Sequence, residues 1–221
     1  MAPLRSVKEL EAYRAELRGK KDPNRRIISV CTGTGCKAYK CDDLAASLRQ
    51  EIIAAGLDGK VEVVTSGCHG FCERGALMVI HPEDIFYQKC KPEDAKEIVE
   101  RTLVKGEILE AHVYVDPTTG EKIIKESDIP FYKHQMQVLM GPGRFIDPTK
   151  IEDYLARDGY AALATVLATM KPDEVVTLVK RSGLRGRGGG GFPAGVKWET
   201  VRQAPGSPKY VLCNADEGDP G

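Results

Sequence analysis

Four cysteines in two short, glycine-containing motifs most constrain what this chain can fold into. The motifs are CTGTGC (31–36) and CHGFC (68–72), which space the cysteines as C-x4-C and C-x3-C. Each motif follows a stretch of branched apolar residues that predicts a β-strand, at 25–31 and at 61–65. If these strands are parallel neighbours, their ends meet at one edge of a sheet and the four thiolates converge there. Such a set of ligands holds an iron–sulfur cluster or zinc.

The long interval between the two pairs and the glycines around them favour a [2Fe–2S] cluster over zinc. Glycine lets the backbone curl closely and direct N–H groups at sulfur. Zinc stays an alternative because structural zinc sites use knuckles of about two to four residues. Buried free thiols are the least favoured interpretation. The glycines concerned are Gly33, Gly35, Gly67, Gly70 and Gly75.

Other candidate ligands lie close to these motifs. Cys41 repeats the x4 spacing from Cys36, so the first ligand pair could be shifted, but its place at a helix start favours Cys31 with Cys36. His69 could serve in a Rieske-type site, but such a site needs two histidines, so a solvent-facing loop histidine is the favoured interpretation. The isolated Cys90 and Cys213 are interpreted as ordinary buried or partly buried thiols.

The first half of the chain predicts a small α/β fold. Helical periodicity at 6–20 begins with Ser6 and Glu9 placed as a capping box. The helix expected at 41–57 has Leu44, Leu48, Ile52 and Ile53 on one face and ends near Gly56. The order of helices and strands is typical of a thioredoxin-like sandwich. The remaining expected elements are strands at 76–80 and 85–90 and a helix at 92–106.

The composition is that of an ordinary globular protein. The chain of 221 residues is 42% hydrophobic and 29% charged, which excludes wholesale disorder. Its 32 basic and 32 acidic residues cancel, so net charge indicates neither nucleic acid nor membrane as a partner. No apolar run approaches the roughly 20 residues of a membrane span, and the first 21 residues lack a signal-peptide pattern. We therefore expect a cytoplasmic protein whose cysteines bind metal or act in redox chemistry.

The residues after Gly106 change character. A hairpin is expected at 112–124 around the turn DPTTG, followed by an extended polar connector at 127–135. Two short helices are expected over 147–170, with a break at Asp158–Gly159, and a third at 171–183. The predicted domains are a first domain at 1–106, a connector at 107–130 and an incomplete second domain at 131–221.

A glycine-rich, basic segment, SGLRGRGGGGFPAGVKWE (182–199), stands out in the second half. Its backbone can approach a phosphate or a flat ring closely, and Arg185, Arg187 and Lys197 add positive charge. A P-loop is excluded because G-x4-G-K-[ST] is absent. A nucleotide or flavin cradle is favoured, while an RNA-binding arginine–glycine segment and a structural glycine turn stay alternatives.

The last segment, YVLCNADEGDPG (210–221), predicts a strand that runs into an acidic loop. Carboxylates at a strand end can hold ribose hydroxyls, and an amide can contact a flavin edge. Taken alone, the acidic residues favour a solvated turn. The candidate ligand-binding residues here are Asn214, Asp216, Glu217 and Asp219.

The cysteine quartet resembles that of the thioredoxin-like [2Fe–2S] ferredoxin domains of NADH dehydrogenases and NAD-linked hydrogenases, over residues 25–105. This resemblance implies a one-electron carrier. The ligands that it implies are Cys31, Cys36, Cys68 and Cys72.

The glycine-rich and acidic segments together resemble the FMN- and NADH-binding motifs of the flavoprotein subunit of respiratory complex I and its soluble relatives. The resemblance implies that FMN, chiefly its phosphate, is held by Gly186, Arg187, Gly188 and Lys197. It places Asn214, Asp216 and Glu217 at the flavin, and Phe192 and Asp219 at the nicotinamide cofactor. Family members commonly carry Ala where Gly190 stands and often Glu where Asp219 stands; the latter leaves the nicotinamide contact open.

The expected fold is therefore α/β: a thioredoxin-like [2Fe–2S] domain followed by the N-terminal part of an FMN/NADH-binding domain. The resemblance implies an oxidoreductase subunit that passes electrons between NAD(P)H, FMN and iron–sulfur clusters in a soluble hydrogenase- or formate dehydrogenase-type complex, with no catalytic acid or nucleophile. It implies other iron–sulfur subunits, and ferredoxin, as partners, and a [4Fe–4S] cluster in a full-length parent. A non-enzymatic electron carrier, a zinc-stabilised interaction domain and a respiratory flavin subunit are alternatives. Because the chain stops inside the acidic motif, weak or no FMN binding and no activity are expected of residues 1–221 alone.

Overall fold

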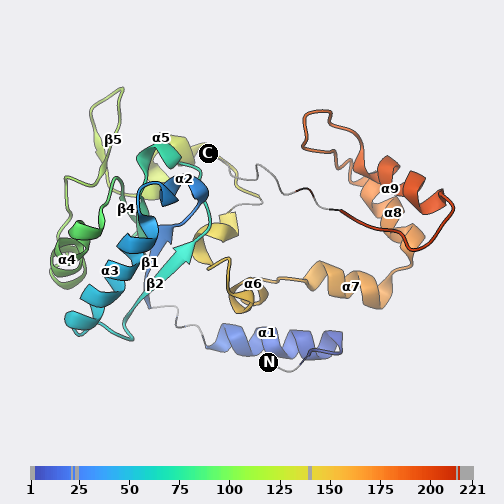
Figure 1. Cartoon of the computed structure of the whole chain (residues 1–221), viewed down its shortest axis with the longest axis horizontal. Coiled ribbons are helices and arrows are strands. Elements are labelled where there is room, and N and C mark those ends of the chain that lie inside the picture. Colours follow the sequence, from blue (N-terminus) through green and yellow to red (C-terminus); the bar gives the residue numbers. More distant parts are fainter. Residues whose placement is uncertain (1–2, 21, 23–24, 139–140, 213, 215–221) are drawn as a thin grey trace. The chain divides into compact units, whose positions relative to one another are not determined.

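The computed structural model describes residues 3–20, 22, 25–138, 141–212 and 214. They divide into two compact units, which we describe separately. The sheet unit comprises described residues of 16–157, and the helical unit comprises described residues of 3–15 and 158–214. Figure 1 labels their helices and strands.

The sheet unit is built on a four-stranded sheet with the order β2-β1-β3-β4. Strand β1 pairs in parallel with β2, and in antiparallel fashion with β3, which in turn pairs with β4. The predicted strands are thus confirmed, with slightly different bounds. These bounds are β1 (Arg26–Cys31), β2 (Val61–Ser66), β3 (Met78–His81) and β4 (Ile85–Tyr87).

Helix α3 (Cys41–Ala54) packs its apolar face on this sheet. Leu44, Leu48 and Ile52 are buried, but Ile53 is 64% exposed, so its predicted place on the buried face is wrong. At about 100° per residue, Ile53 follows Ile52 around the helix and leaves the narrow stripe that faces the strands. The helix ends where expected, since Gly56 adopts a φ of +69°.

The expected helix at 92–106 changes its winding along its length. A tight turn at Pro92–Asp94 leads into one α-helical turn, α4 (Ala95–Glu97), and then a wider π-helical stretch at Ile98–Val104. Gly106, with a φ of +72°, follows its end. The segment buries Ala95, Ile98, Val99 and Leu103 in the core.

The residues beyond Gly106 belong physically to the same core. The hairpin of β5 (Tyr114–Val115) and β6 (Lys122–Ile123) is confirmed, with the Asp116 carboxylate accepting the backbone N–H groups of its turn. The stretch expected to be extended at 127–135 instead forms helix α5 (Pro130–Lys133), because Ile129 and Tyr132 turn into the core. The limits of the domains stay a prediction.

We expect Ile129→Ala to destabilise the sheet unit by about 2–5 kcal/mol, because Ile129 is fully buried and its truncation leaves a cavity. Val138→Ala is the matched control, since Val138 is 74% exposed. Urea unfolding of the two variants measures the difference. Equal stability of the two variants would mean that residues after Gly106 add nothing to the core.

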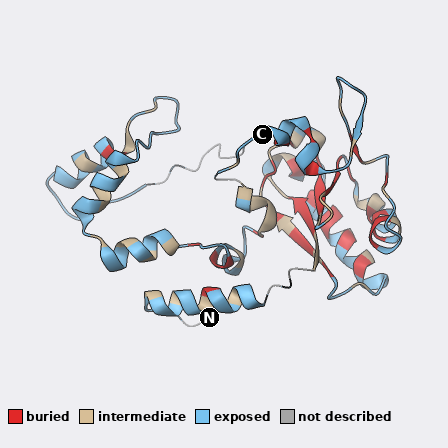
Figure 2. Cartoon of the chain, turned by 180° about the vertical axis from the view of Figure 1, so that it is seen from behind, coloured by how far each residue is buried: buried red, intermediate tan, exposed pale blue. Residues whose placement is uncertain are grey.

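The helical unit contains few buried side chains (Figure 2). Among described residues 158–214, only Gly159 and Gly195 are buried. The predicted helices after Asp158 are confirmed as α7 (Ala161–Thr169) and α8 (Pro172–Arg181), and α9 (Ala194–Gln203) packs against α8. Helix α1 (Val7–Gly19) begins as expected, with Ser6 Oγ accepting Glu9 N–H at 3.2 Å, although the Glu9 carboxylate accepts the N–H of Arg5 rather than that of Ser6. Helix α6 (Ile151–Ala156) lies in the sheet unit.

Two further observations concern the whole described chain. No helix within it is long and apolar enough to cross a membrane. Tyr210–Leu212 form no strand, contrary to expectation, and the described part of the helical unit offers no neighbouring strand with which they could pair.

Candidate functional site

The parallel pairing of β1 and β2 brings the two cysteine motifs to one edge of the sheet. Cys31 is the last residue of β1 and stands in register with Ser66, the last residue of β2. The backbone N–H of Thr32 donates to the carbonyl of Ser66 at 3.1 Å and continues this pairing into the loops. Cys36 follows in the short helix α2 (Thr34–Lys37), while Cys68 and Cys72 lie in the loop after β2.

The four sulfur atoms form a continuous series of contacts. The Cys31 thiol contacts those of Cys36 and Cys68, and Cys68 Sγ lies 4.0 Å from Cys72 Sγ. Cys72 is partly exposed, and the other three are buried. In the described part of the chain, no group of three or more histidine, cysteine or carboxylate side chains is arranged to hold a metal ion directly. The structure therefore gathers the four predicted residues, and their role as ligands is a proposal.

The thiols are stabilised in their protonated form. The hydrogen bond with Cys36, followed by burial, raises the pKa of the Cys31 thiol to about 11. The hydrogen bond with Cys31 and burial raise the pKa of the Cys68 thiol further. Since a metal binds the thiolate, loading this site must release protons.

Three glycines form walls against the sulfur atoms. A Cβ atom on Gly33 would lie 2.9 Å from Cys68 Cβ, and one on Gly35 would lie 3.0 Å from Cys72 Sγ. A Cβ atom on Gly75 would lie 3.1 Å from Cys36 Sγ. Larger residues at these places would displace the cysteines, so the glycines keep the sulfur atoms together.

Hydrogen-bond donors also point at this site. The backbone N–H of Gly70 donates to Cys68 Sγ at 3.3 Å, and the backbone N–H of His69 donates to the Cys31 sulfur. Tyr132 Oη is buried without a partner among the described residues, and burial followed by nearby charges raises its pKa. Four thiols with N–H donors and close glycine walls fit a thiolate-ligated iron–sulfur cluster.

The other cysteines stand apart from this series. Cys41 begins α3 with a buried side chain, and burial raises the pKa of its thiol to about 11. Cys90 is buried, as predicted, and burial raises the pKa of its thiol as well. Cys213 lies outside the described residues.

The prediction of a solvent-facing His69 is wrong. Its side chain is fully buried, with Nε2 2.9 Å from Ser66 Oγ and Nδ1 3.2 Å from a Glu126 carboxylate oxygen. Glu126 is 57 positions further along the chain, so no local pattern around CHGFC could reveal this partner. The only signal was an acidic residue in a segment that sequence patterns assign to a connector.

The glycine-rich segment of the helical unit closes on itself. Gly186 N–H donates to the Phe192 carbonyl at 2.9 Å, and Ala194 N–H donates to the Leu184 carbonyl at 2.8 Å. At its tip, Gly189 and Gly191 adopt φ values of +94° and +57°, which favour glycine. A Cβ atom on any residue of Gly188–Gly191 would meet nothing within 4 Å, so the tip leaves a bare backbone that a flat ligand can approach.

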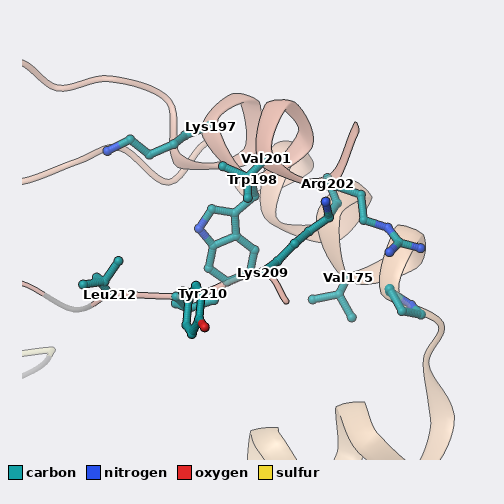
Figure 3. A pocket seen from close by; sticks show the side chains of 11 residues that line it. Val175, Lys197, Trp198, Val201, Arg202, Lys209, Tyr210 and Leu212 are labelled. Atoms are coloured by element: carbon teal, nitrogen blue, oxygen red, sulfur yellow. The ribbon is translucent and has the colours of Figure 1, made fainter. Parts of the chain in front are cut away.

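The basic side chains of this segment do not all point at one place. Arg185 Nη1 donates to the Gly191 carbonyl and Arg187 Nη1 to the Arg185 carbonyl, so both arginines fold over the loop. Lys197 instead stands on α9 and lines a pocket of about 540 Å³ between α8, α9 and 209–212. In Figure 3 the Trp198 indole reaches from α9 toward Tyr210, and Lys197 extends away from it.

The remaining predicted flavin and nicotinamide residues are only partly described. Phe192 is 56% exposed. Asn214 is exposed as well. Asp216, Glu217 and Asp219 lie outside the described residues. The described residues thus fit the approach of a ligand to the glycine tip, while the FMN and NADH contacts stay proposals.

Gly195 lets α8 and α9 cross closely, since a Cβ atom there would lie 2.5 Å from Lys180 Cα. We expect Gly195→Ala to separate these helices and cost about 1–3 kcal/mol by overpacking. Gly190→Ala is the control, because that Cβ atom meets open space. Hydrogen exchange of 172–203 measures the effect: faster exchange in Gly195→Ala alone is expected, and equal exchange in both variants would contradict the close crossing.

Comparisons with known proteins agree with both parts of the chain. Residues 7–103 match the thioredoxin-like [2Fe–2S] ferredoxin family. Residues 179–221 match the Nuo51 FMN-binding domain family. The second match begins within α8 and includes the glycine-rich segment.

Similar curated proteins are subunits of oxidoreductases. The NADP-reducing hydrogenase subunit HndC of Solidesulfovibrio fructosivorans is 57% identical over 88 residues, which are 40% of this chain and 18% of HndC. An F-type subunit of the NADH-quinone oxidoreductase of Rhizobium meliloti is 58% identical over 71 residues, which are 32% of this chain and 17% of its own length. The chain therefore spans less than a fifth of the length of these relatives.

Among solved structures, the thioredoxin-like [2Fe–2S] ferredoxin from Aquifex aeolicus is 24% identical and is matched over 42% of this chain and 99% of its own. Its TM-score of 0.39 is too low to carry an argument. The two family matches, by contrast, fall on the segments that hold the cysteine quartet and the glycine-rich loop. The chain thus joins a thioredoxin-like [2Fe–2S] ferredoxin region, at residues 7–103, to a Nuo51 FMN-binding region that begins at residue 179.

Proposed function

We propose that this chain is the electron-transfer part of an NAD(P)H-dependent oxidoreductase subunit, which moves electrons between NAD(P)H, FMN and iron–sulfur clusters. The observation that carries the proposal is the convergence of four cysteine sulfurs between glycine walls at one sheet edge. The family matches on both sides of the chain support the pairing of a one-electron carrier with a flavin.

The first group to be held is the [2Fe–2S] cluster, which supplies one-electron transfer when bound. Its ligands would be Cys31, Cys36, Cys68 and Cys72. The chain's own contribution is to exclude water from three of these sulfurs by burial and to donate the N–H groups of His69 and Gly70. Such donors favour the reduced, more negative form of a cluster.

The second group is FMN, which exchanges either one or two electrons and so connects hydride donors with one-electron carriers. The bare backbone at Gly188–Gly191 would receive the flavin nucleotide. Gly186, Arg187 and Lys197 would hold chiefly its phosphate, and Phe192 would contact the nicotinamide cofactor. Asn214, Asp216, Glu217 and Asp219 would complete the flavin and nicotinamide contacts.

Within this class we favour a hydrogenase- or formate dehydrogenase-type complex in the cytoplasm over a respiratory flavin subunit. Both regions lie in one chain, and the match to the NADP-reducing hydrogenase protein extends over 88 residues, against 71 for the NADH-quinone oxidoreductase protein. Other iron–sulfur subunits, and ferredoxin, would then be the partners. A [4Fe–4S] cluster would belong to the longer parent.

Reductive titration of the full chain after cluster reconstitution tests the proposed function. We expect uptake of about one electron per chain, with an electron paramagnetic resonance signal of a reduced [2Fe–2S] cluster. A colourless chain that takes up no electrons would contradict the proposal, and a zinc-stabilised domain would give that result.

We expect residues 1–221 alone to bind FMN weakly and to lack NAD(P)H oxidation. The physical reason is that described residues 158–214 bury only Gly159 and Gly195, so they provide little enclosed surface for a flavin. Fluorescence titration with FMN measures the affinity. Stoichiometric flavin on the purified chain would contradict this expectation.

A further inference from the structure

A buried, charged network lies directly behind the cysteine site. The Glu126 carboxylate receives His69 Nδ1 at 3.2 Å and Arg144 Nη1 at 2.6 Å. On its other side, His69 Nε2 lies 2.9 Å from Ser66 Oγ and 3.4 Å from Ser29 Oγ, which come from β2 and β1. The Glu126 side chain is 5% exposed and the Arg144 side chain 20%.

The network keeps a full charge pair in the interior. Burial by itself would raise the pKa of Glu126, but the hydrogen bond with His69 and the charges of His69 and Arg144 lower it below its ordinary value. The carboxylate therefore remains ionised at neutral pH. Charges held away from water act over longer distances than surface charges, because solvent screens them less.

The backbone joins this network to the cysteine loop. His69 follows Cys68 directly, and its own N–H donates to the Cys31 sulfur. Next to it, Gly67 N–H donates to the Gly143 carbonyl at 3.0 Å, and Ser29 Oγ donates to the Arg144 carbonyl. The residues that carry the charges thus fasten the loop that carries the sulfurs.

We propose that Glu126 and Arg144 are positioning residues that tune the reduction potential of the cluster held by the four cysteines. Glu126 fixes the ring of His69 and places a negative charge behind the site, whereas Arg144 places a positive charge there. Reduction adds one electron from an external one-electron donor to the cluster and breaks no bond of the chain. The added negative charge is opposed by Glu126 and favoured by Arg144. This inference rests on the proposed function, because it requires a bound cluster.

Potentiometric titration followed by electron paramagnetic resonance tests this tuning on the full, reconstituted chain. We expect Glu126→Gln to shift the midpoint potential upward and Arg144→Gln to shift it downward. A tenfold change in the equilibrium constant of one-electron reduction corresponds to about 59 mV, and we expect shifts of that order. The double variant, which removes both charges, is expected to return toward the unchanged chain.

The control is Glu110→Gln, since Glu110 forms a comparable ion pair with Lys122 at 2.6 Å but is 73% exposed. Solvent screening should leave its potential unchanged. Iron content and far-ultraviolet circular dichroism establish that each variant is folded and loaded, and the double variant preserves a test if a single variant loses its cluster.

Opposite shifts of the single variants would support the inference, since a purely structural role predicts no dependence on the sign of the lost charge. Unchanged potentials, or shifts in the same direction, in loaded variants would overturn it and leave the proposed function standing. Failure of the unchanged chain to bind a cluster would instead overturn the proposed function, and this inference with it.

Discussion

Replacing Cys68 by serine is expected to abolish assembly of a stable [2Fe–2S] cluster, with loss of most of the visible absorption. Cys68 occupies the middle of the series of sulfur contacts, touching both Cys31 and Cys72. A serine hydroxyl is a poor ligand for iron compared with a thiolate, which is the group that iron–sulfur clusters use. The same loss is expected for Cys31→Ser, whose thiol touches those of Cys36 and Cys68.

Cys90→Ser and Cys41→Ser are the matched controls for this experiment. Both cysteines are buried in the same unit, so their replacement perturbs the core without touching the proposed ligand set. Cluster content is expected to stay close to that of the unchanged chain. Loss of the cluster in Cys41→Ser together with its retention in Cys36→Ser would show that the ligand pair is shifted by one motif, contrary to our assignment.

Replacing Gly33 by alanine is expected to have the second-largest effect, because it alters the site without removing a ligand. The new Cβ atom would lie 2.9 Å from Cys68 Cβ and 3.2 Å from Cys68 Cα. Because these are backbone and near-backbone atoms, the loop after β2 must shift to relieve the clash. Gly33 has a φ of −58°, so backbone strain does not contribute. We expect at least a tenfold loss of cluster occupancy, corresponding to about 1.4 kcal/mol, within the usual cost of overpacking.

Gly19→Ala is the control for Gly33→Ala, since its Cβ atom would meet nothing within 4 Å. Iron bound per chain and the midpoint of urea unfolding are the two measurements. A Gly33→Ala variant that binds iron as fully as Gly19→Ala would mean that the close approach of the two loops is not needed to hold the cluster.

The core of the sheet unit could be predicted because its signals are local. Branched apolar runs mark β1 and β2, and the helical spacing of Leu44 and Leu48 marks α3. The convergence of the cysteines follows from one further step, the parallel pairing of β1 with β2, which the structure confirms.

What sequence patterns missed depends on contacts between distant residues. His69 is buried because Glu126 and the hydroxyls of Ser29 and Ser66 satisfy its ring nitrogens, and only Ser66 lies nearby in the sequence. Likewise, the polar appearance of 127–135 conceals Ile129 and Tyr132, whose burial depends on the strands that they cover. A polar side chain can be buried wherever its partners are brought to it.

The glycine-rich segment shows the opposite balance. Its composition predicts a bare loop, and the tip at Gly188–Gly191 is bare. The directions of its basic side chains could not be foreseen, since Arg185 and Arg187 donate to carbonyls of their own loop. Which of these bonds a bound flavin nucleotide would replace depends on charges that it brings itself.

Chemical quantitation of iron, zinc and acid-labile sulfide in chain prepared without oxygen addresses the cysteine site most directly. Our account predicts about two iron atoms and about two sulfide ions per chain, both lost together in Cys68→Ser. Stoichiometric zinc without sulfide, or a chain that holds neither metal nor sulfide after reconstitution, would contradict it.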